Sequence, residues 1–494
     1  MGIGSRTART AGIAAVALAI TAGTVGAAGA APSGDEAGDG GRPGVGRLDG
    51  VWRTDGYGTL VEIHGTTLTT YDTTRISCTP GWIGAEQVGA PGPGGGVRYG
   101  RTGVKYGEFT ITPRGRDRAV YKEDGAPSIR NLARLPGGLP ALCGQAAPQD
   151  ALSVFDRFWA TFEENYPFFA AKGVDWRAEG AKARALLNPR SSTDDLQKVI
   201  ADLLRPLGDA HTGLGRKQGE HWKGVFAGIR PGTEEPTDRV REQAAQAVAA
   251  QLLAPERTFG GGLLGVGELP GGVGYLRVSG FDGYVEDASY QDQAAELDKA
   301  LDALLAHPER LTGLVIDLRL NGGGSDSLGL RIAARLTDRS FLAYRKVARN
   351  DPADPTRFTA PQSIRVHPAT GATRFTGPVA LLTAGSTASA GETFTQAMAE
   401  RRPAPVRIGE NTQGVFSDIM YKPLSAELTA VLPNEEFRTP AGSTYDGPGI
   451  PPDVRTPVFT PEELNQRRDS ALTEARRILA GGQTASGTPA ASAR

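Results

Sequence analysis

The chain contains little cysteine, histidine or methionine: its 494 residues include 2 Cys, 5 His and 3 Met. Because soft ligands are scarce and no H-E-x-x-H motif is present, we expect no metal site and no cofactor. The spacings of phosphate-binding glycine loops are also missing, which argues against nucleotide binding. The charges are balanced, with 54 Lys and Arg against 55 Asp and Glu. A nucleic-acid binder needs a basic face, so we expect no nucleic-acid partner.

Long hydrophobic runs are absent outside the N-terminus, where a basic start with Arg6 and Arg9 precedes an apolar stretch of small residues. This pattern is typical of a secretory signal, and "AGA" at 28–30 resembles a cleavage site. We predict a cleaved signal peptide over 1–31, a disordered leader over 32–46, and a secreted protein with no stable membrane association after cleavage. The alternative is an uncleaved membrane anchor, but the stretch is only weakly apolar.

The two cysteines, Cys78 and Cys143, are expected to pair because exported proteins fold in oxidising compartments. Closing a loop of this length contributes about 4 kcal/mol in the chain-entropy model. The alternative is a pair of unrelated buried thiols. Both cysteines lie within or at the end of a segment, 47–145, whose alternating pattern predicts strands and hairpins, for example in "TLVEIHGTTLTTYDTT" and "GEFTITPRGRDRAVYKED". We therefore expect a β-rich domain stabilised by one disulfide.

A helical segment is predicted over 150–225, because apolar residues recur every three to four positions in "DALSVFDRFWATFEENYPFF" and in "SSTDDLQKVIADLL". Asp150 and either Ser192 or Thr193 are the expected N-caps. Pro206 ends the second helix and leaves "GDAHTG", with His211, as a turn.

From 226 to 460 the pattern becomes α/β. Two strand–turn–helix units, "LTGLVIDLRL–NGGGSD–SLGLRIAARLT" and "GPVALLTAG–SAGETFTQAMAER", predict a parallel sheet covered by helices. A C-terminal helix and disordered tail are expected over 461–494. The chain is thus predicted to be multidomain, with an all-β domain, a helical segment and an α/β core.

Ser389 lies at the second of these turns, where only small residues surround it. A serine hydroxyl becomes nucleophilic when a base takes its proton, and the reaction needs backbone N–H groups that face the developing oxyanion. The N–H of Ala390 and a glycine N–H from Gly322 to Gly324 could serve. The alternative is that Ser389 only caps a helix. Asp317 and Arg319 could likewise be a structural ion pair that shapes the glycine turn, and Asp209 could cap its own turn.

Together, "LVIDLRLNGGG", "TAGSTASAGETF" and "IGENTQG" resemble the core of the C-terminal-processing (tail-specific) and tricorn-core serine peptidases. The segments "YPFFAAKGVDW" and "LLRPLGDAHTGL" are similar to the helical part that precedes the core in the tricorn-like branch. The resemblance spans about residues 150–460. It implies a core of the crotonase-like βα spiral type and a peptide or protein substrate. Too few residues separate Leu214 from Leu276 for the PDZ module of tail-specific relatives.

The resemblance also assigns roles. The tail-specific branch places a basic lysine where this chain has Val415, and Lys422 would need a shifted register, so His211 of "LGDAHTG" is the expected general base. His221, His307 and His367 lie in no family motif. "YDGPGIPPD" matches the frame that carries the orienting acid, but with Asp446 where relatives have Glu. The expected catalytic residues are Ser389, His211 and Asp446, with Glu410 and Asp418 as alternative acids and Gly323, Gly324 and Ala390 as the oxyanion hole.

The sequence therefore predicts a secreted serine endopeptidase that forms an acyl-enzyme on Ser389. Two alternatives remain open: a non-catalytic module of the same fold that binds apolar ligands, and an esterase that uses the same triad. Neither the cleavage preference nor the oligomeric state can be predicted from the sequence.

Overall fold

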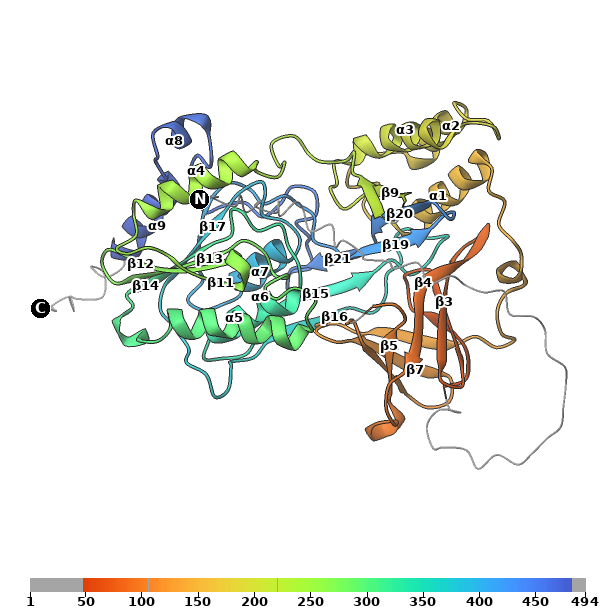
Figure 1. Cartoon of the computed structure of the whole chain (residues 1–494), viewed down its shortest axis with the longest axis horizontal. Helices are drawn as coiled ribbons and strands as arrows, with labels where there is room; N and C mark the ends of the chain where they lie inside the picture. The colour runs from red at the N-terminus through yellow and green to blue at the C-terminus, as the bar shows by residue number, and fades with distance from the viewer. Residues whose placement is uncertain (1–47, 105, 220, 482–494) are drawn as a thin grey trace, which may run out of the picture.

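The computed structural model describes residues 48–104, 106–219 and 221–481. A β-barrel, a group of three helices and an α/β core lie against one another, with the barrel and the three helices at the same end of the molecule (Figure 1). The predicted signal peptide (1–31) and leader (32–46) lie outside the described residues, as do residues 482–494 of the predicted tail. In the part of the chain that is described, no helix is long and apolar enough to cross a membrane.

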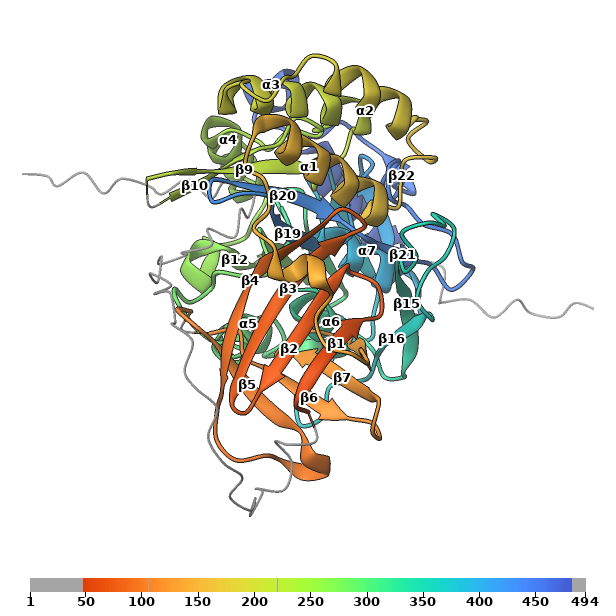
Figure 2. The same cartoon turned by 90° about the vertical axis from the view of Figure 1, so that its right-hand side faces the viewer.

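The N-terminal domain is a closed barrel of eight antiparallel strands, in which β1 pairs with both β2 and β8 (Figure 2). The two predicted hairpins are β2–β3 and β6–β7. Alternate side chains fill the interior, among them Trp52, Phe109 and Leu132, each fully buried. The strands are β1 (Gly50–Thr54), β2 (Thr59–His64), β3 (Thr67–Thr74), β4 (Ser77–Gln87), β5 (Val97–Arg101), β6 (Phe109–Pro113), β7 (Arg118–Glu123) and β8 (Arg130–Arg134).

The predicted disulfide is confirmed. Cys78 on β4 is bonded to Cys143, which lies in the short 3₁₀ helix Ala141–Gly144 after the last barrel strand. The bond therefore attaches the segment that leaves the barrel to the barrel wall.

Three helices follow: α1 (Ala151–Asn165), α2 (Trp176–Arg184) and α3 (Thr193–Leu204). Asp150 caps α1 and Ser192 caps α3 in a capping box with Asp195, as predicted. The aromatic residues of α1 pack inward, where Phe158 and Phe162 are fully buried. Pro206 falls in a 3₁₀ turn that ends at Gly208 in the left-handed conformation, φ 53°. The chain therefore turns sharply just before His211.

The core is a seven-stranded sheet in the order β11-β12-β13-β14-β17-β18-β22. The predicted parallel pairing of the two strand–turn–helix units is present as β14–β17. The strands are β11 (Arg257–Phe259), β12 (Leu264–Leu269), β13 (Val273–Val278), β14 (Gly313–Asp317), β17 (Val379–Thr383), β18 (Val406–Gly409) and β22 (Val454–Arg455).

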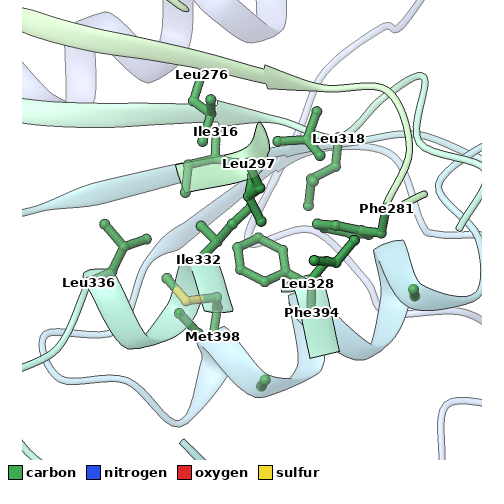
Figure 3. Close-up of a cluster of buried hydrophobic side chains, with 14 of the residues drawn as sticks. Leu276, Phe281, Leu297, Ile316, Leu318, Leu328, Ile332, Leu336, Phe394 and Met398 are labelled. Carbon is green, nitrogen blue, oxygen red and sulfur yellow. The ribbon is translucent and has the colours of Figure 1, made fainter. Parts of the chain in front are cut away.

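Helices cover both faces of this sheet. On one face α5 (Tyr290–Leu304), α6 (Asp326–Arg335) and α7 (Ala390–Ala399) pack Leu297, Ile332, Phe394 and Met398 against Leu276 and Ile316 (Figure 3). On the other face, Val248 of α4 (Asp238–Ala249) and Leu472 of α9 (Ser470–Gly481) cover the opposite sides of the same strands. The short helix α8 (Pro461–Asn465) precedes α9. Alternate side chains of each strand thus pack into the apolar layer on one face of the sheet or the other.

Two smaller sheets join the three parts. One has the order β10-β9-β20-β19 and the other β16-β15-β21. β9 begins two residues after His211, so its pairing with β20 joins the helical segment to the core. These strands are β9 (Gly213–Gln218), β10 (His221–Val225), β19 (Ile419–Pro423), β20 (Leu428–Pro433), β15 (Phe341–Ala348), β16 (Gln362–Val366) and β21 (Glu435–Arg438).

Candidate active site

Ser389 occupies the turn between β17 and α7 in an unusual backbone conformation, φ 53° and ψ −121°. Residues other than glycine rarely adopt a positive φ, and such strain persists only where neighbouring groups hold it. Here the Ser389 N–H donates to Val415 O at 2.9 Å, and the Ala388 N–H donates to Asn321 O at 3.0 Å. The Ser389 side chain is partly exposed. The hydroxyl is therefore presented to solvent from a backbone that is fixed on both sides.

The glycine turn after β14 lies directly against Ser389. Gly323 has φ +113°, and a Cβ at this position would lie 2.6 Å from Ser389 Cβ and 3.1 Å from Ser389 Oγ. Asn321, fully buried, fixes the turn: its Nδ2 donates to Val278 O at 3.0 Å and its Oδ1 accepts the Gly323 N–H at 2.9 Å. Only glycine allows the backbone to approach the serine this closely.

The candidate oxyanion donors differ in their availability. The Gly323 N–H is already bonded to Asn321 Oδ1. The N–H groups of Gly324 and Ala390 donate to no other group in the described part of the chain. Ala390 is also the first residue of α7, where the helix dipole favours negative charge. Of the three predicted residues, Gly324 and Ala390 therefore have N–H groups that could donate to an anion.

The ion pair predicted between Asp317 and Arg319 is present and extends further. Arg319, fully buried, contacts Asp317 Oδ2 at 2.6 Å and Asp469 Oδ2 at 2.8 Å. Tyr275 OH donates to the same Asp317 oxygen at 2.9 Å. The Arg319 carbonyl accepts the Ser386 hydroxyl at 2.6 Å. This cluster therefore connects the ends of the two strands that carry the glycine turn and the serine turn.

His211 lies two residues before β9 and is 8% exposed. The backbone N–H of His211 donates to Asp209 Oδ1 at 2.9 Å, and Tyr166 OH donates to Asp209 Oδ2 at 2.9 Å. Asp209 therefore stabilises the local turn, as predicted. Burial lowers the pKa of His211, while the charge of Asp209, the Ser417 backbone and the charge of Asp418 oppose that shift. A buried imidazole with a lowered pKa is neutral near pH 7 and can accept a proton.

His211 and Ser389 come from segments that touch. Ala210 and Ala388, the residues before each of them, pack together with Val415 in one small apolar cluster. No hydrogen bond joins Ser389 Oγ to the imidazole in the described part of the chain, and His211 Nδ1 is buried without a partner. Such contacts often form only when substrate binds. The other histidines lie elsewhere: His307 is largely exposed, and His367 bonds to Ser340.

The three candidate acids have different surroundings. Asp446 is buried, and its oxygens accept the Phe416 N–H at 3.2 Å and the Thr444 hydroxyl at 2.7 Å. Among the described residues, Asp446 forms no hydrogen bond with His211. Burial raises the pKa of Asp446 well above its usual range, and Asp209 and Glu392 add to the shift. Asp418 pairs with Lys346 at 2.5 Å, and its charge acts on His211. Glu410 follows β18 and is half-buried.

Lys422 does not point toward the serine. Its Nζ donates to Tyr57 O at 2.6 Å and to Thr59 Oγ1 at 2.8 Å, and it pairs with Asp72, all three in the barrel. Val415 instead places an apolar side chain beside Ala388. The position that carries the basic lysine in the tail-specific branch is therefore apolar here. Among the described residues, no three His, Cys, Asp or Glu side chains are grouped so that they could hold a metal ion.

Glu392 is a functional residue that the sequence analysis missed, although it closes the motif "SAGE". Its fully buried carboxylate accepts bonds from Thr412 Oγ1 at 2.5 Å, Gly414 N at 2.7 Å and Val415 N at 2.8 Å. Burial raises its pKa to about 7, against the effect of these donors. Since Val415 O accepts the Ser389 N–H, Glu392 holds the segment that fixes the serine backbone.

We expect Glu392→Gln to destabilise the protein by about 2 kcal/mol, because either orientation of the amide places an NH₂ group against a donor. The free energy of unfolding, measured by urea titration at pH 8, checks this. Glu400→Gln, at the end of the same helix, is the matched control and should leave the unfolding midpoint unchanged. Equal midpoints for the two variants would show that Glu392 does not hold this segment.

Two family models match the chain: "Peptidase family S41" over residues 272–456 and "Tricorn protease C1 domain" over residues 147–205. No curated protein matches the sequence. A protein of known structure from Parabacteroides merdae ATCC 43184, described as a candidate peptidase, is similar at 22% identity with a TM-score of 0.55, over 67% of this chain and 97% of its own. This likeness shows a shared fold.

Weaker likenesses extend to two proteases of known structure. The tricorn protease is 14% identical over 86% of this chain and 46% of its own, with a TM-score of 0.41. The photosystem II D1 C-terminal processing protease is 18% identical over 67% of this chain and 97% of its own, with a TM-score of 0.38.

Proposed function

We propose that Ser389 is the nucleophile of this serine-type peptidase and His211 its general base, because residues 272–456 are a peptidase family S41 domain. The observation that carries this proposal is the contact between the glycine turn and the strained serine turn. The two turns are so close that a Cβ at position 323, which Gly323 lacks, would lie 3.1 Å from Ser389 Oγ. The proposed core is of the crotonase-like βα spiral type.

In the proposed reaction, the substrate carbonyl lies over the turn with its oxygen facing the N–H groups of Ala390 and Gly324, since the Gly323 N–H is already bonded to Asn321. His211 takes the Ser389 proton as Oγ attacks the carbonyl carbon, and the negative charge moves to the carbonyl oxygen. Collapse of this intermediate breaks the C–N bond while His211 returns the proton to the leaving amine. Water, activated by the same imidazole, then releases the acyl group and restores the serine.

Asp446 is the proposed orienting acid. Support comes from the buried, unpartnered Nδ1 of His211, which needs an acceptor when the imidazole becomes charged. Asp446 lies in the same neighbourhood, because it accepts the N–H of Phe416, which follows the Val415 that packs against Ala210 and Ala388. Asp418 is the alternative that the electrostatics favour, since it already acts on His211. Glu410, the other alternative, has no comparable interaction with His211 among the described residues.

The protein is proposed to act outside the cell after cleavage of a signal peptide at about residue 31. The Cys78–Cys143 disulfide supports export, because such bonds persist in oxidising compartments. The proposed division of the chain is a barrel at 47–145, a helical domain at 150–225, a core at 226–460 and a terminal helix and tail at 461–494.

A fluorophosphonate probe tests the proposed nucleophile, and paired substrates test the reaction. We expect the purified protein to become labelled on the peptide that contains Ser389, and to hydrolyse an unfolded polypeptide as well as a small acyl ester. Hydrolysis of the ester alone would favour the esterase. Folded protein that neither reacts with the probe nor turns over either substrate would overturn the proposal and favour the non-catalytic binding module.

A further inference from the structure

The barrel inserts one turn into the peptidase core. This turn, between β1 and β2, contains Gly56 and Tyr57, both with positive φ (80° and 67°). A Cβ at Gly56 would lie 2.8 Å from Arg349 O at the end of β15, so the turn packs tightly against the core. Tyr57 is 5% exposed, and Arg130 of the barrel lies over its ring at 4.4 Å. The strained turn therefore delivers one tyrosine to a buried place in another domain.

The Tyr57 hydroxyl donates to Glu435 Oε1 at 2.6 Å. Glu435, 1% exposed at the start of β21, also pairs with Lys346 Nζ at 3.0 Å. The Tyr57 carbonyl accepts Lys422 Nζ from β19, so the core holds the residue by its backbone as well as by its hydroxyl. A buried carboxylate that loses a hydrogen-bond donor costs free energy, so removal of the Tyr57 hydroxyl weakens the way in which Glu435 is held.

Glu435 in turn holds the segment that precedes β19. Its Oε2 accepts the Asp418 N–H at 3.3 Å, and its own N–H donates to Ser417 Oγ at 3.2 Å. Ser417 and Asp418 are thereby bonded to the residue that receives the Tyr57 hydroxyl.

His211 lies near the same end of the four-stranded sheet β10-β9-β20-β19, where Ser417 and Asp418 precede β19. β20 pairs with β9 at Val431 and Gly213, and with β19 at Pro433 and Ile419. Continuation of the β9 register by two residues places His211 beside Pro433, next to the segment that precedes Ile419. Consistent with this placement, the Ser417 backbone and the charge of Asp418 both oppose the lowering of the pKa of His211.

We propose that the barrel positions the general base: Tyr57 and Glu435 act as positioning residues that hold Ser417 and Asp418 against His211. This proposal rests on the proposed role of His211 and adds a function for the barrel, that of completing the active site. The Tyr57 hydroxyl has no contact with Ser389 or His211 among the described residues, so its effect must pass through Glu435.

A change in the titration of His211 is the specific consequence. The ionisable groups around the imidazole are Asp209 from its own turn, Tyr166 behind Asp209, and Asp418 from the segment held by Glu435, with Asp446 beyond Tyr166. Asp418 and the Ser417 backbone both act to raise the pKa of His211 against the effect of burial. Loss of the Tyr57 hydroxyl loosens both, so the pKa of His211 should fall further.

The test is an NMR titration of the ring carbons of the five histidines, in which the signal absent from His211→Ala assigns His211. Tyr57→Phe and Glu435→Gln should lower its pKa by at least about 0.3, a twofold change in protonation equilibrium. Tyr71→Phe is the matched control, because Tyr71 OH bonds to Glu62 of the barrel itself rather than to a residue of the core. An unchanged pKa in folded Tyr57→Phe would overturn the proposal, and this result is readable whether or not the protein hydrolyses peptides.

Kinetics give a second measurement. Tyr57→Phe should lower kcat about tenfold with KM within about twofold, since a base held less firmly slows the chemical step without changing substrate contacts. The acidic limb of the kcat/KM profile should move to lower pH, whereas Tyr71→Phe should match the wild type. Equal losses in the two tyrosine variants would indicate a general effect on the barrel and refute the specific link. Failure of the proposed function would appear differently, as activity that survives Ser389→Ala.

Discussion

Ser389→Ala should lower kcat for peptide hydrolysis by about 10⁴-fold or more while the protein remains folded. Loss of the nucleophile removes the covalent pathway and leaves only the contribution of binding and oxyanion contacts, which accounts for losses of this size in serine peptidases. The fold should tolerate the change, because the Ser389 backbone is held by Val415 O and the side chain caps nothing in α7. Steady-state kinetics and thermal unfolding measure the two quantities.

Ser363→Ala is the matched control, since Ser363 is an exposed serine on β16, away from both turns. It should retain wild-type kcat and wild-type labelling by the fluorophosphonate. A Ser389→Ala variant that keeps more than about one tenth of the wild-type kcat would exclude an acyl-enzyme on this residue, because general-base attack by water cannot match a covalent pathway of this size.

Local signals in the sequence predicted the elements that surround the site. Asp150 and Ser192 cap their helices because a short polar side chain before an apolar repeat can bond to the first free N–H groups. β14 and β17 are parallel neighbours because two buried strands, each followed by a glycine- or serine-containing turn and a helix, can be joined only by crossovers. Asp317 and Arg319 are only two residues apart, so the sequence alone could indicate that they form an ion pair beside the glycine turn.

Contacts between distant segments could not be predicted in this way. The barrel closes through the pairing of β1 with β8, and nothing in the local pattern of either strand specifies that partner. Lys422 lies on a core strand, and nothing in the local sequence shows that its buried Nζ pairs with Asp72 of the barrel. Glu392 and Asn321 both lie in motifs, but their partners are far away in the sequence. The Glu392 carboxylate accepts a bond from Thr412, and the Asn321 amide donates to Val278 O on a neighbouring strand.

The orienting acid shows the same limit most clearly. A family frame aligned Asp446 with the usual acid, whereas the burial and charges of the folded chain bring Asp209 and Asp418 to act on His211 as well. Which carboxylate meets Nδ1 depends on side-chain directions at the junction of three segments. A sequence motif specifies the residue type at each position but not these directions.

His211→Ala should lower kcat/KM by about 10⁴-fold, since Ser389 would lose the group that accepts its proton.

In the wild type, burial lowers the pKa of His211. Only the neutral imidazole acts as a base, so kcat/KM should rise with pH through a midpoint below the ordinary histidine value of about 6.5 and then stay level. His367→Ala, a change at an exposed histidine bonded to Ser340, should leave both the rate and this midpoint unchanged. A midpoint that persists in His211→Ala would assign the titration to another group, and full activity in that variant would remove His211 from the mechanism.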